Sequence, residues 1–272
     1  MKFKKILGML LMVALRTRLP LPHGLRERAT QLGETKIAHQ ALDSLFEDRN
    51  LAWDYRGFWV VDPMPTDLDL DTYYSNSYWL GRSDSQTWLK RRDVDHFLML
   101  EPFLRSSGEC TQKVAVNFGS GHGGCSFLLR AAGFEVWNVD PAKNELSIFR
   151  HSSTVSQVPK NLDLVYASHS LEHVTEPIET INEIVERLGI GGLFFVEVPN
   201  ARRSDEIISR ENGAKEPPIH PPHTVYYTTD FFRGLGLKIL ILDTYSYSPG
   251  PFAVTTESDD AEVIRYLGQK VA

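Results

Sequence analysis

Two clusters of histidine and acid side chains have spacings that could support chemistry. In the first, "SHSLEH", His169, Glu172 and His173 spell H-x-x-E-H, which is a zinc-protease signature when it lies on a long helix. A catalytic zinc site also needs a third protein ligand. However, His169 ends the apolar run "LDLVYAS", which predicts a strand, and Glu176 and Pro177 follow too soon for a long helix. We therefore expect a strand end that leads into a short helix, and not a protease.

The second cluster, "IHPPHTVYY", contains His220, His223, Tyr226 and Tyr227. A histidine suits general-base catalysis because its pKa lies close to the pH at which enzymes work. His223 could therefore take a proton from a substrate, or it could merely anchor its loop through hydrogen bonds. The residues alone leave both interpretations open.

A glycine-rich turn, "NFGSGHGG", lies between the apolar run "KVAVNF" and the predicted helix "CSFLLRAAG". Gly119 and Gly121 lack a Cβ atom, so the backbone can turn sharply there and approach a ligand closely. Gly123 would let the start of the helix pack near the sheet. Asp140 ends the next predicted strand about 20 residues later, where a carboxylate can bind ribose hydroxyls. The pattern favours a cofactor that contains a nucleoside; the alternative is that Asp140 is only a turn residue.

The elements around these residues predict an α/β fold. Strands alternate with helices from residue 113 to residue 200, which indicates a mostly parallel sheet covered by helices on both faces. The last two apolar runs, 237–247 and 251–258, are separated only by "SPG". A connection this short permits only an antiparallel pair. We therefore expect an antiparallel hairpin at one edge of the sheet.

The segments before this sheet differ from it in character. Residues 1–50 predict a helical extension, and residues 51–110 an aromatic-rich cap that leads into a domain at 111–272. The apolar run 6–15 is too short to span a membrane as a helix, which needs about 20 residues. It fits the core of a signal peptide, but basic residues follow it and no cleavage site is present. We expect residues 1–20 to form a helix that packs on the body of a cytoplasmic protein or contacts a membrane surface; a signal or an anchor is the alternative.

Charge and cysteine content narrow the classes of partner. The net charge is −6, from 29 basic and 35 acidic residues, which argues against a nucleic-acid partner because phosphate binding needs a basic surface. Cys110 and Cys125 form no C-x-x-C pair, so neither a zinc ribbon nor a disulfide framework is expected. They indicate reduced thiols in the cytosol. The sequence leaves the oligomeric state open.

In these motifs the chain resembles the class I S-adenosylmethionine-dependent methyltransferases, especially the small-molecule branch that includes ubiquinone-type O-methyltransferases. The segments that carry the resemblance stand in the family's order: "VAVNFGSGHGG", "VWNVDPAKN", "LDLVYASHSLEHVTEP", "IGGLFFVEVPN" and "PPHTVYYTTDFFRGLGLKIL". The resemblance implies a Rossmann-like, doubly wound, mostly parallel seven-stranded sheet with an antiparallel C-terminal hairpin at 111–272, preceded by the helical and aromatic cap. It also implies S-adenosylmethionine as cofactor and S-adenosylhomocysteine as product.

The resemblance assigns residues to the cofactor site. They line the glycine turn, the end of the second strand and the end of the fourth: Asn117, Phe118, Gly119, Ser120, Gly121, Gly123, Asp140, Pro141, Ser168 and His169. One departure matters, because the family usually has an acid at the position of Asn117, where it helps to hold the amino group of the cofactor. An amide lacks that charge, which implies weaker binding or a non-catalytic relative. The segment "HSSTVSQVP" also offers only Ser and Thr where the family often has an acid near the adenine.

The resemblance also gives the histidine clusters roles. His223 matches a recurring histidine that can act as the general base, and His169, nearest the transferred methyl, is the rival base. Some ubiquinone-type members hold a divalent cation at positions that match His169, Glu172 and His173. Because His169 replaces an acid, an oxygen-ligated ion such as Mg²⁺ is disfavoured, and we expect no metal. Residues expected to form the substrate pocket or its lid are Tyr73, Tyr74, Tyr78, His173 and Tyr226; the alternative for the aromatic ones is a plain core.

The expected function is methyl transfer from S-adenosylmethionine to a small molecule, through a hydroxyl of a sugar or natural product. This choice of acceptor rests on family analogy. The alternatives are an N- or C-methyltransferase, a non-catalytic S-adenosylmethionine-binding partner protein, and a nicotinamide-dependent oxidoreductase. Binding of S-adenosylhomocysteine, compared with binding of NAD, would separate the last of these from the others.

Overall fold

The computed structural model describes residues 46–76, 90–105, 113–121, 123–141, 148–201, 217, 219–246 and 261–271. The chain divides into two compact units, Met1–Ala38 with Thr72–Val158 and His39–Asp71 with Pro159–Ala272, which are described in turn. Most of the expected helical extension lies outside the described residues, as do Tyr78 and Cys110. None of the described helices is long and apolar enough to cross a membrane. The expected domain boundaries and the expected role of residues 1–20 stay predictions.

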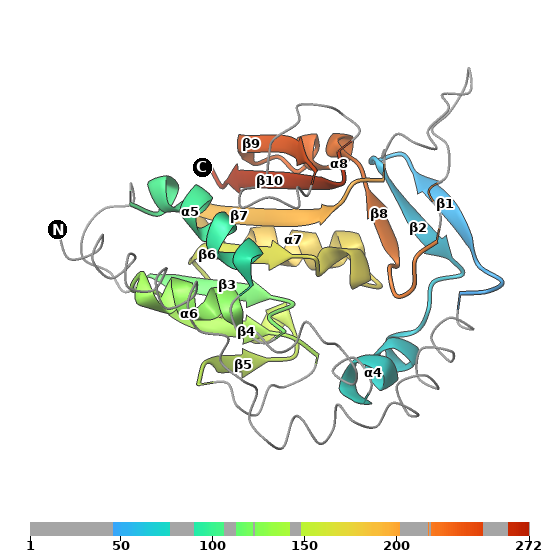
Figure 1. The fold of residues 1–272 in the computed structure, drawn as a ribbon, viewed down its shortest axis with the longest axis horizontal. Coiled ribbons are helices and arrows are strands. Elements are labelled where there is room, and N and C mark those ends of the chain that lie inside the picture. Colours follow the sequence, from blue (N-terminus) through green and yellow to red (C-terminus); the bar gives the residue numbers. More distant parts are fainter. Residues whose placement is uncertain are drawn as a thin grey trace. The chain divides into compact units, whose positions relative to one another are not determined.

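The first unit contains the strand–turn–helix pattern that the sequence predicts. Its elements are α5 (Arg91–Arg105), β3 (Val114–Phe118), α6 (Gly124–Ala131), β4 (Glu135–Val139), β5 (Arg150–Ser152) and the 3₁₀ turn η2 (Val155–Gln157). β3 pairs parallel with β4, and β4 pairs parallel with β5. Gly133 follows the end of α6, and its positive φ of 97° lets the amide of Phe134 donate back to the carbonyl of Leu129. α6 packs on β3 and β4, in front of them in Figure 1, and α5 packs against α6.

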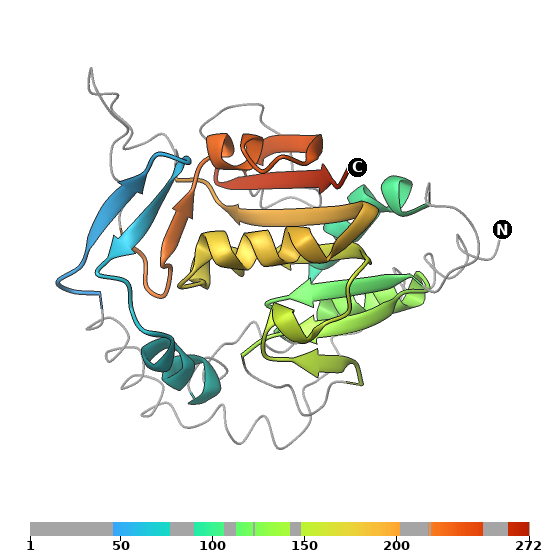
Figure 2. The ribbon, with the colours of Figure 1, turned by 180° about the vertical axis from the view of Figure 1, so that it is seen from behind.

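The second unit contains β6 (Leu162–Ser168), the 3₁₀ turn η3 (Leu171–His173), α7 (Pro177–Arg187), β7 (Leu188–Pro199), α8 (Thr229–Arg233), β9 (Lys238–Tyr245) and β10 (Val263–Gln269). β6 pairs parallel with β7, and β10 is antiparallel to both β7 and β9. The middle of β6 and of β7 is buried on both faces, as expected for continuous apolar runs. Figure 2 shows α7 lying along β6 and β7.

Seven strands form the main sheet, three from the first unit in the order β5-β4-β3 and four from the second in the order β6-β7-β10-β9. The predicted mostly parallel α/β fold with antiparallel C-terminal strands is therefore confirmed. β9 pairs with Val263–Gln269, a strand that the sequence analysis did not identify, whereas the expected partner at residues 251–258 lies outside the described residues. The short "SPG" connection suggested a tight hairpin, whereas the true partner strand carries a charged residue, Arg265, at its centre.

A small antiparallel sheet within the second unit was not predicted as strands. It has the order β1-β2-β8, with β1 at Asn50–Asp54, β2 at Phe58–Asp62 and β8 at Val225–Tyr227. A Cβ atom on Gly57, in the turn between β1 and β2, would lie 2.7 Å from the amide nitrogen of Phe231 in α8. Thr228 donates to the carbonyl of Gly57 through its amide and its hydroxyl, at 3.1 and 2.7 Å. These contacts fix the segment that follows the second histidine cluster.

Helix α4 (Asp67–Asn76) follows the small sheet along the chain and carries two of the tyrosines expected in a lid. Tyr74 is half-buried within this helix, and the side chain of Tyr73 is outside what the structure describes. The lid role of the tyrosines therefore stays a prediction.

Candidate active site

The glycine turn of the first unit is held to the end of β4. Gly119, Gly121 and Gly123 have φ angles of 64°, 51° and 74°, a conformation that side chains with a Cβ rarely adopt. The amide of Gly119 donates to the carbonyl of Val139 at 2.7 Å, and the amide of Gly121 donates to Oδ2 of Asp140 at 2.8 Å. Asp140 thus shapes the turn with one oxygen. Because a carboxylate offers about four acceptor sites, it can hold ribose hydroxyls as well.

Asn117 belongs to a buried hydrogen-bond network beneath this turn. Its Nδ2 donates to Oγ of Ser126 at 2.8 Å, and Ser126 donates to Oδ1 of Asn138 at 2.6 Å. Asn138 in turn limits the turn, because a Cβ atom on Gly123 would lie 3.3 Å from its Nδ2. The side-chain nitrogen of Asn117 therefore supports the turn. The side-chain oxygen, Oδ1, is the atom that could accept a hydrogen bond from the amino group of a ligand.

The segment after β5 shows how the hydroxyl groups expected near an adenine are used. Oγ of Ser152 lies 2.6 Å from the carbonyl oxygen of Thr154 and 2.9 Å from Oε1 of Gln157, and it can donate its one proton to either. His151, which the sequence did not single out, lies with Nε2 2.9 Å from the Asp140 carbonyl. Residues 148–158 contain no acid side chain, so within this described segment the polar groups are those of serine, threonine, glutamine, histidine and arginine.

In the second unit, His169 lies between two buried carboxylates. It follows the end of β6 with a φ of 50°, and its amide donates to the carbonyl of Glu197 at 2.8 Å. Nδ1 of the ring lies 3.2 Å from Oε1 of Glu172, and Nε2 lies 3.3 Å from Oε1 of Glu197. The other oxygen of Glu197 accepts a hydrogen bond of 2.6 Å from Nε of Arg265. Four ionisable groups therefore contact one another in series.

Glu172, on η3, is a buried carboxylate that two histidine rings approach. Its side chain is 2% exposed, and its Oε1 lies 3.2 Å from Nδ1 of His169 and 3.9 Å from Nε2 of His173. Burial by itself raises the pKa of this carboxyl group, but proximity to His169 and the positive charge that His173 can carry outweigh burial and lower the pKa to about 2. Glu172 is therefore ionised at neutral pH and attracts positive charge.

His223 is attached to η3 by its neighbour in the chain. The amide of Thr224 donates to the carbonyl of Glu172 at 2.8 Å, and its hydroxyl donates to the carbonyl of Val174 at 2.6 Å. The rings of His223 and His173 meet edge to face with centroids 5.0 Å apart. Burial, together with the positive charge that His173 can carry, outweighs the attraction of Glu172 and lowers the pKa of His223 to about 4. Its imidazole is therefore neutral at pH 7.

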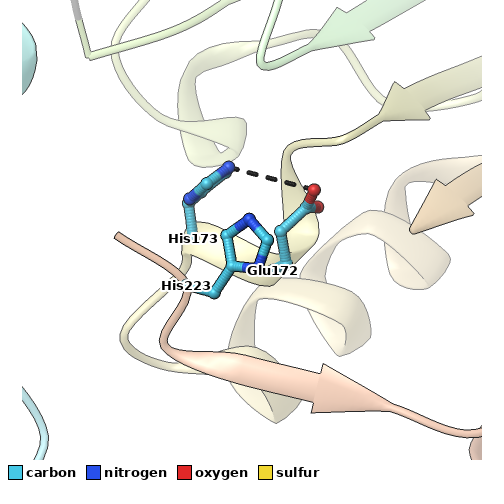
Figure 3. Close-up of side chains that lie close together, drawn as sticks. All are labelled: Glu172, His173 and His223. Carbon is cyan, nitrogen blue, oxygen red and sulfur yellow. Dashed lines mark ion pairs between the residues drawn. The ribbon is translucent and has the colours of Figure 1, made fainter. Parts of the chain in front are cut away.

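Figure 3 shows Glu172, His173 and His223 gathered from η3 and from the loop before β8. The dashed line joins Nε2 of His173 to Oε1 of Glu172, 3.9 Å apart. One ligand atom from each of the three side chains lies within 4.8 Å of the others, so the group could hold a metal ion. Among the described residues, the possible metal-binding group therefore contains His223 beside Glu172 and His173, whereas His169 contacts Glu172 separately. The expectation that the protein holds no metal stays a prediction.

A protein-family comparison identifies the chain. The family described as "Methyltransferase domain" matches residues 95–235, which include the glycine turn and both histidine clusters. The chain belongs to this family. No curated protein sequence matches the chain. The predicted class I methyltransferase is therefore confirmed at the level of family and fold, whereas its placement in the ubiquinone-type branch stays a prediction.

Solved structures similar to this methyltransferase share its fold. A 1,6-didemethyltoxoflavin-N1-methyltransferase from Burkholderia thailandensis, solved with 1,6-didemethyltoxoflavin and S-adenosylhomocysteine bound, is 15% identical with a TM-score of 0.53. The similarity covers 83% of this chain and 97% of that one. A methyltransferase from Archaeoglobus fulgidus is 16% identical with a TM-score of 0.43, over 66% of this chain and 95% of the other. The likeness to the Burkholderia enzyme concerns the fold alone.

The predicted site residues of the methyltransferase fall into two groups. Most of those predicted to bind the cofactor lie in the first unit, whereas Ser168 and the histidines lie in the second. Tyr226 lies beside His223, accepts a hydrogen bond from the amide of His220 at 2.7 Å, and has its pKa raised to about 12 by burial. The sequence analysis missed Glu197 and Arg265. A lone acid within the apolar run "LFFVEV" was a usable signal for Glu197.

The methyltransferase is expected to lose stability in acid because of His223 and Glu172. Their folded pKa values, about 4 and about 2, lie below the ordinary values of 6.5 and 4.5, so the unfolded chain binds more protons as the pH falls. The stability from neutral His223 is complete above pH 6.5 and is lost toward pH 4. We expect about 2 kcal/mol to be lost between pH 7 and pH 5, measured by urea denaturation. His223→Gln should flatten this change; an equal loss in the variant would contradict the assignment.

Proposed function

We propose that this methyltransferase moves a methyl group from S-adenosylmethionine to a hydroxyl of a small molecule, such as a sugar or natural product, and that His223 accepts the hydroxyl proton. The observation that carries the proposal is that a half-buried imidazole with a lowered pKa has a ring nitrogen within 4.8 Å of an oxygen of the ionised Glu172 carboxylate. The imidazole can take a proton at neutral pH, and the carboxylate stabilises the imidazolium that results.

The glycine turn and Asp140 are the residues that we propose to bind the cofactor. S-adenosylmethionine supplies an electrophilic methyl group on a sulfonium, so the protein needs to bind and orient rather than to activate it chemically. The turn brings backbone close to the ligand, and the carboxylate of Asp140 accepts hydrogen bonds from ribose hydroxyls. Asn117 is proposed to accept a hydrogen bond from the amino group through its oxygen, without the charge that an acid would add.

A base with a depressed pKa is adequate for this reaction. The acceptor oxygen forms its bond to the methyl carbon while the carbon–sulfur bond breaks and sulfur keeps the electron pair. Because the oxygen gains positive character during this step, its proton becomes strongly acidic and passes to a ring nitrogen of His223. His169 is the weaker candidate because both of its ring nitrogens already face carboxylates at 3.2 and 3.3 Å.

A nitrogen acceptor is the second candidate. The Burkholderia enzyme, whose fold is similar, is named as an N1-methyltransferase of 1,6-didemethyltoxoflavin. Its likeness supports a small-molecule acceptor but leaves the acceptor atom open. Formation of S-adenosylhomocysteine across a panel of sugars, phenols and nitrogen heterocycles would decide. Turnover of the heterocycles alone would replace the hydroxyl proposal.

Cofactor binding is the first test, and Asp140 is its most direct probe. We expect calorimetry to show binding of S-adenosylhomocysteine but not of NAD, and Asp140→Asn to weaken that binding about 10- to 100-fold. The asparagine can still accept from the amide of Gly121 but loses the charge and one acceptor oxygen. Glu135→Gln, which alters a surface ion pair with Arg150 in the same unit, is the matched control and should bind normally.

Other outcomes would point to other functions. Binding of NAD without S-adenosylhomocysteine would indicate an oxidoreductase. Binding of S-adenosylhomocysteine without turnover of any acceptor would indicate a non-catalytic partner protein, as the amide at position 117 allows. The metal content of protein prepared without chelators is a further test. One metal ion per protein molecule, lost in His223→Gln, would indicate a metal-assisted reaction at Glu172, His173 and His223 in place of proton transfer to His223.

A further inference from the structure

Arg265 and Glu197 form a buried pair that the proposed proton transfer does not use directly. We propose that Arg265, acting through Glu197, is a positioning residue that holds His169 and, through it, the Glu172 carboxylate beside His223. This inference rests on the proposed function. The contacts run from Nε of Arg265 to Glu197 at 2.6 Å, from Glu197 to Nε2 of His169 at 3.3 Å, and from Nδ1 of His169 to Glu172 at 3.2 Å.

The first link is fixed by the sheet. Arg265 on β10 stands directly opposite Glu197 on β7 in the antiparallel register, and directly opposite Asp243 on β9. Its guanidinium carbon lies 4.4 Å from the ring centroid of Tyr245, and its side chain is only 7% exposed. An ion pair this deeply buried loses so much hydration that it is poor evidence for stability alone. Its contact with His169 gives it a function.

His169 connects the two carboxylates. A neutral imidazole carries one N–H, so it can donate to only one of them, and its other nitrogen would present a lone pair to an anion. Both contacts are favourable only when both nitrogens carry a proton. The series then alternates in charge as Arg265⁺, Glu197⁻, His169⁺ and Glu172⁻. The remaining ionisable groups that face Glu172 are His173 and His223.

The backbone of His169 also ties this residue to Glu197. Its φ of 50° is uncommon for a residue with a side chain, and its amide donates to the carbonyl of Glu197, the residue whose carboxylate its ring also contacts. A conformation that costs energy and persists beside reactive groups points to a positional role. His169 therefore transmits the placement of β7 and β10 to η3.

The test removes the pair without leaving one charge unpaired. In the double variant Glu197→Gln/Arg265→Met, we expect kcat to fall about 10- to 100-fold while the KM for S-adenosylmethionine is unchanged, because only the placement of Glu172 is altered. The single variant Arg265→Lys, which keeps the positive charge, should lose less kcat than the double variant. Arg233→Met, which breaks an exposed arginine–aspartate pair in the same unit, should behave as the parent enzyme.

A second readout does not depend on turnover. Nitrogen-15 NMR of histidine-labelled protein should show the ring signals of His169 shifted in the double variant relative to the parent, because Nε2 loses its contact with the Glu197 carboxylate. An unchanged His169 signal, or an unchanged kcat, in a folded double variant would overturn the inference. Full activity of His223→Gln would contradict the proposed role of His223 as the base. It would leave the link between Arg265 and His169 open to its own test, because the NMR signal of His169 reports that link without turnover.

Discussion

His223→Gln is expected to keep the fold and the affinity for S-adenosylhomocysteine, while kcat for methyl transfer falls about 100- to 10,000-fold. The amide of glutamine fills similar space and can accept a hydrogen bond, but it cannot take the acceptor proton. Because hydrogen bonds of Thr224 hold the loop to Glu172 and Val174, the substitution at position 223 should leave the surrounding loop in place. Single-turnover measurements with saturating cofactor would isolate the chemical step.

The control is His220→Gln, three residues earlier in the same loop. His220 is exposed, and its ring centroid lies 6.4 Å from that of His223. We expect it to react at the parental rate. A His223→Gln enzyme with parental kcat would show that the ring only anchors the loop, which is the alternative that the sequence left open.

The pH dependence of the parent enzyme offers an independent check on His223. With a pKa of about 4, the imidazole stays unprotonated through the neutral range, so kcat/KM should be level from about pH 8 to about pH 5 and fall only below that. A histidine with the ordinary value of 6.5 would produce its fall two units higher. A midpoint near 6.5 would therefore transfer the base role to another histidine.

The glycine turn and Asp140 could be predicted because their signals are local. The glycine turn lies directly between a strand and a helix, and each of its glycines has a positive φ angle that glycine adopts most readily. Asp140 could be found because the end of the next strand is fixed by its apolar run. The structure adds a direct link between these two signals, since the amide of Gly121 donates to Asp140.

The contacts of the two histidine clusters could be predicted only in part, because they join segments that are distant in the sequence. Glu172 and His223 are 51 positions apart, and nothing in either motif states that Thr224 ties the second loop to the first. Arg265 was missed for a related reason. The last strand was expected at 251–258, so "VIRYLGQ" was not considered as a strand, and a central arginine does not suggest a buried position. The strand register, which sequence patterns do not give, is what places Arg265 opposite Glu197.

The small sheet β1-β2-β8 was missed although its first two strands have suitable residues. "NLAWD" and "FWVVD" are short and rich in aromatic and β-branched residues, and Gly57 separates them. The aromatic content of the whole region suggested a cap, which obscured this hairpin. Its third strand comes from residues 225–227, far along the chain, and such pairings leave little trace in a local pattern.

The buried pair between Arg265 and Glu197 should have a large and asymmetric effect on stability. Arg265→Met alone leaves the carboxylate of Glu197, which is fully buried, without its guanidinium partner. Removing one partner of a buried ion pair costs about 3–5 kcal/mol in the free energy of unfolding. We expect a loss of this size in urea denaturation at pH 7.

The double variant Glu197→Gln/Arg265→Met should recover most of that loss, because it removes both charges and their hydration penalties while keeping similar volumes. Arg233→Met, whose ion pair is exposed, should change the unfolding free energy by less than about 1 kcal/mol. Equal losses in the single and double variants would mean that packing of the arginine stem against Tyr245, and not charge pairing, holds β10 to β7. The expected asymmetry would instead show that Glu197 is ionised in the folded protein, which is the condition under which it can hold a charged His169.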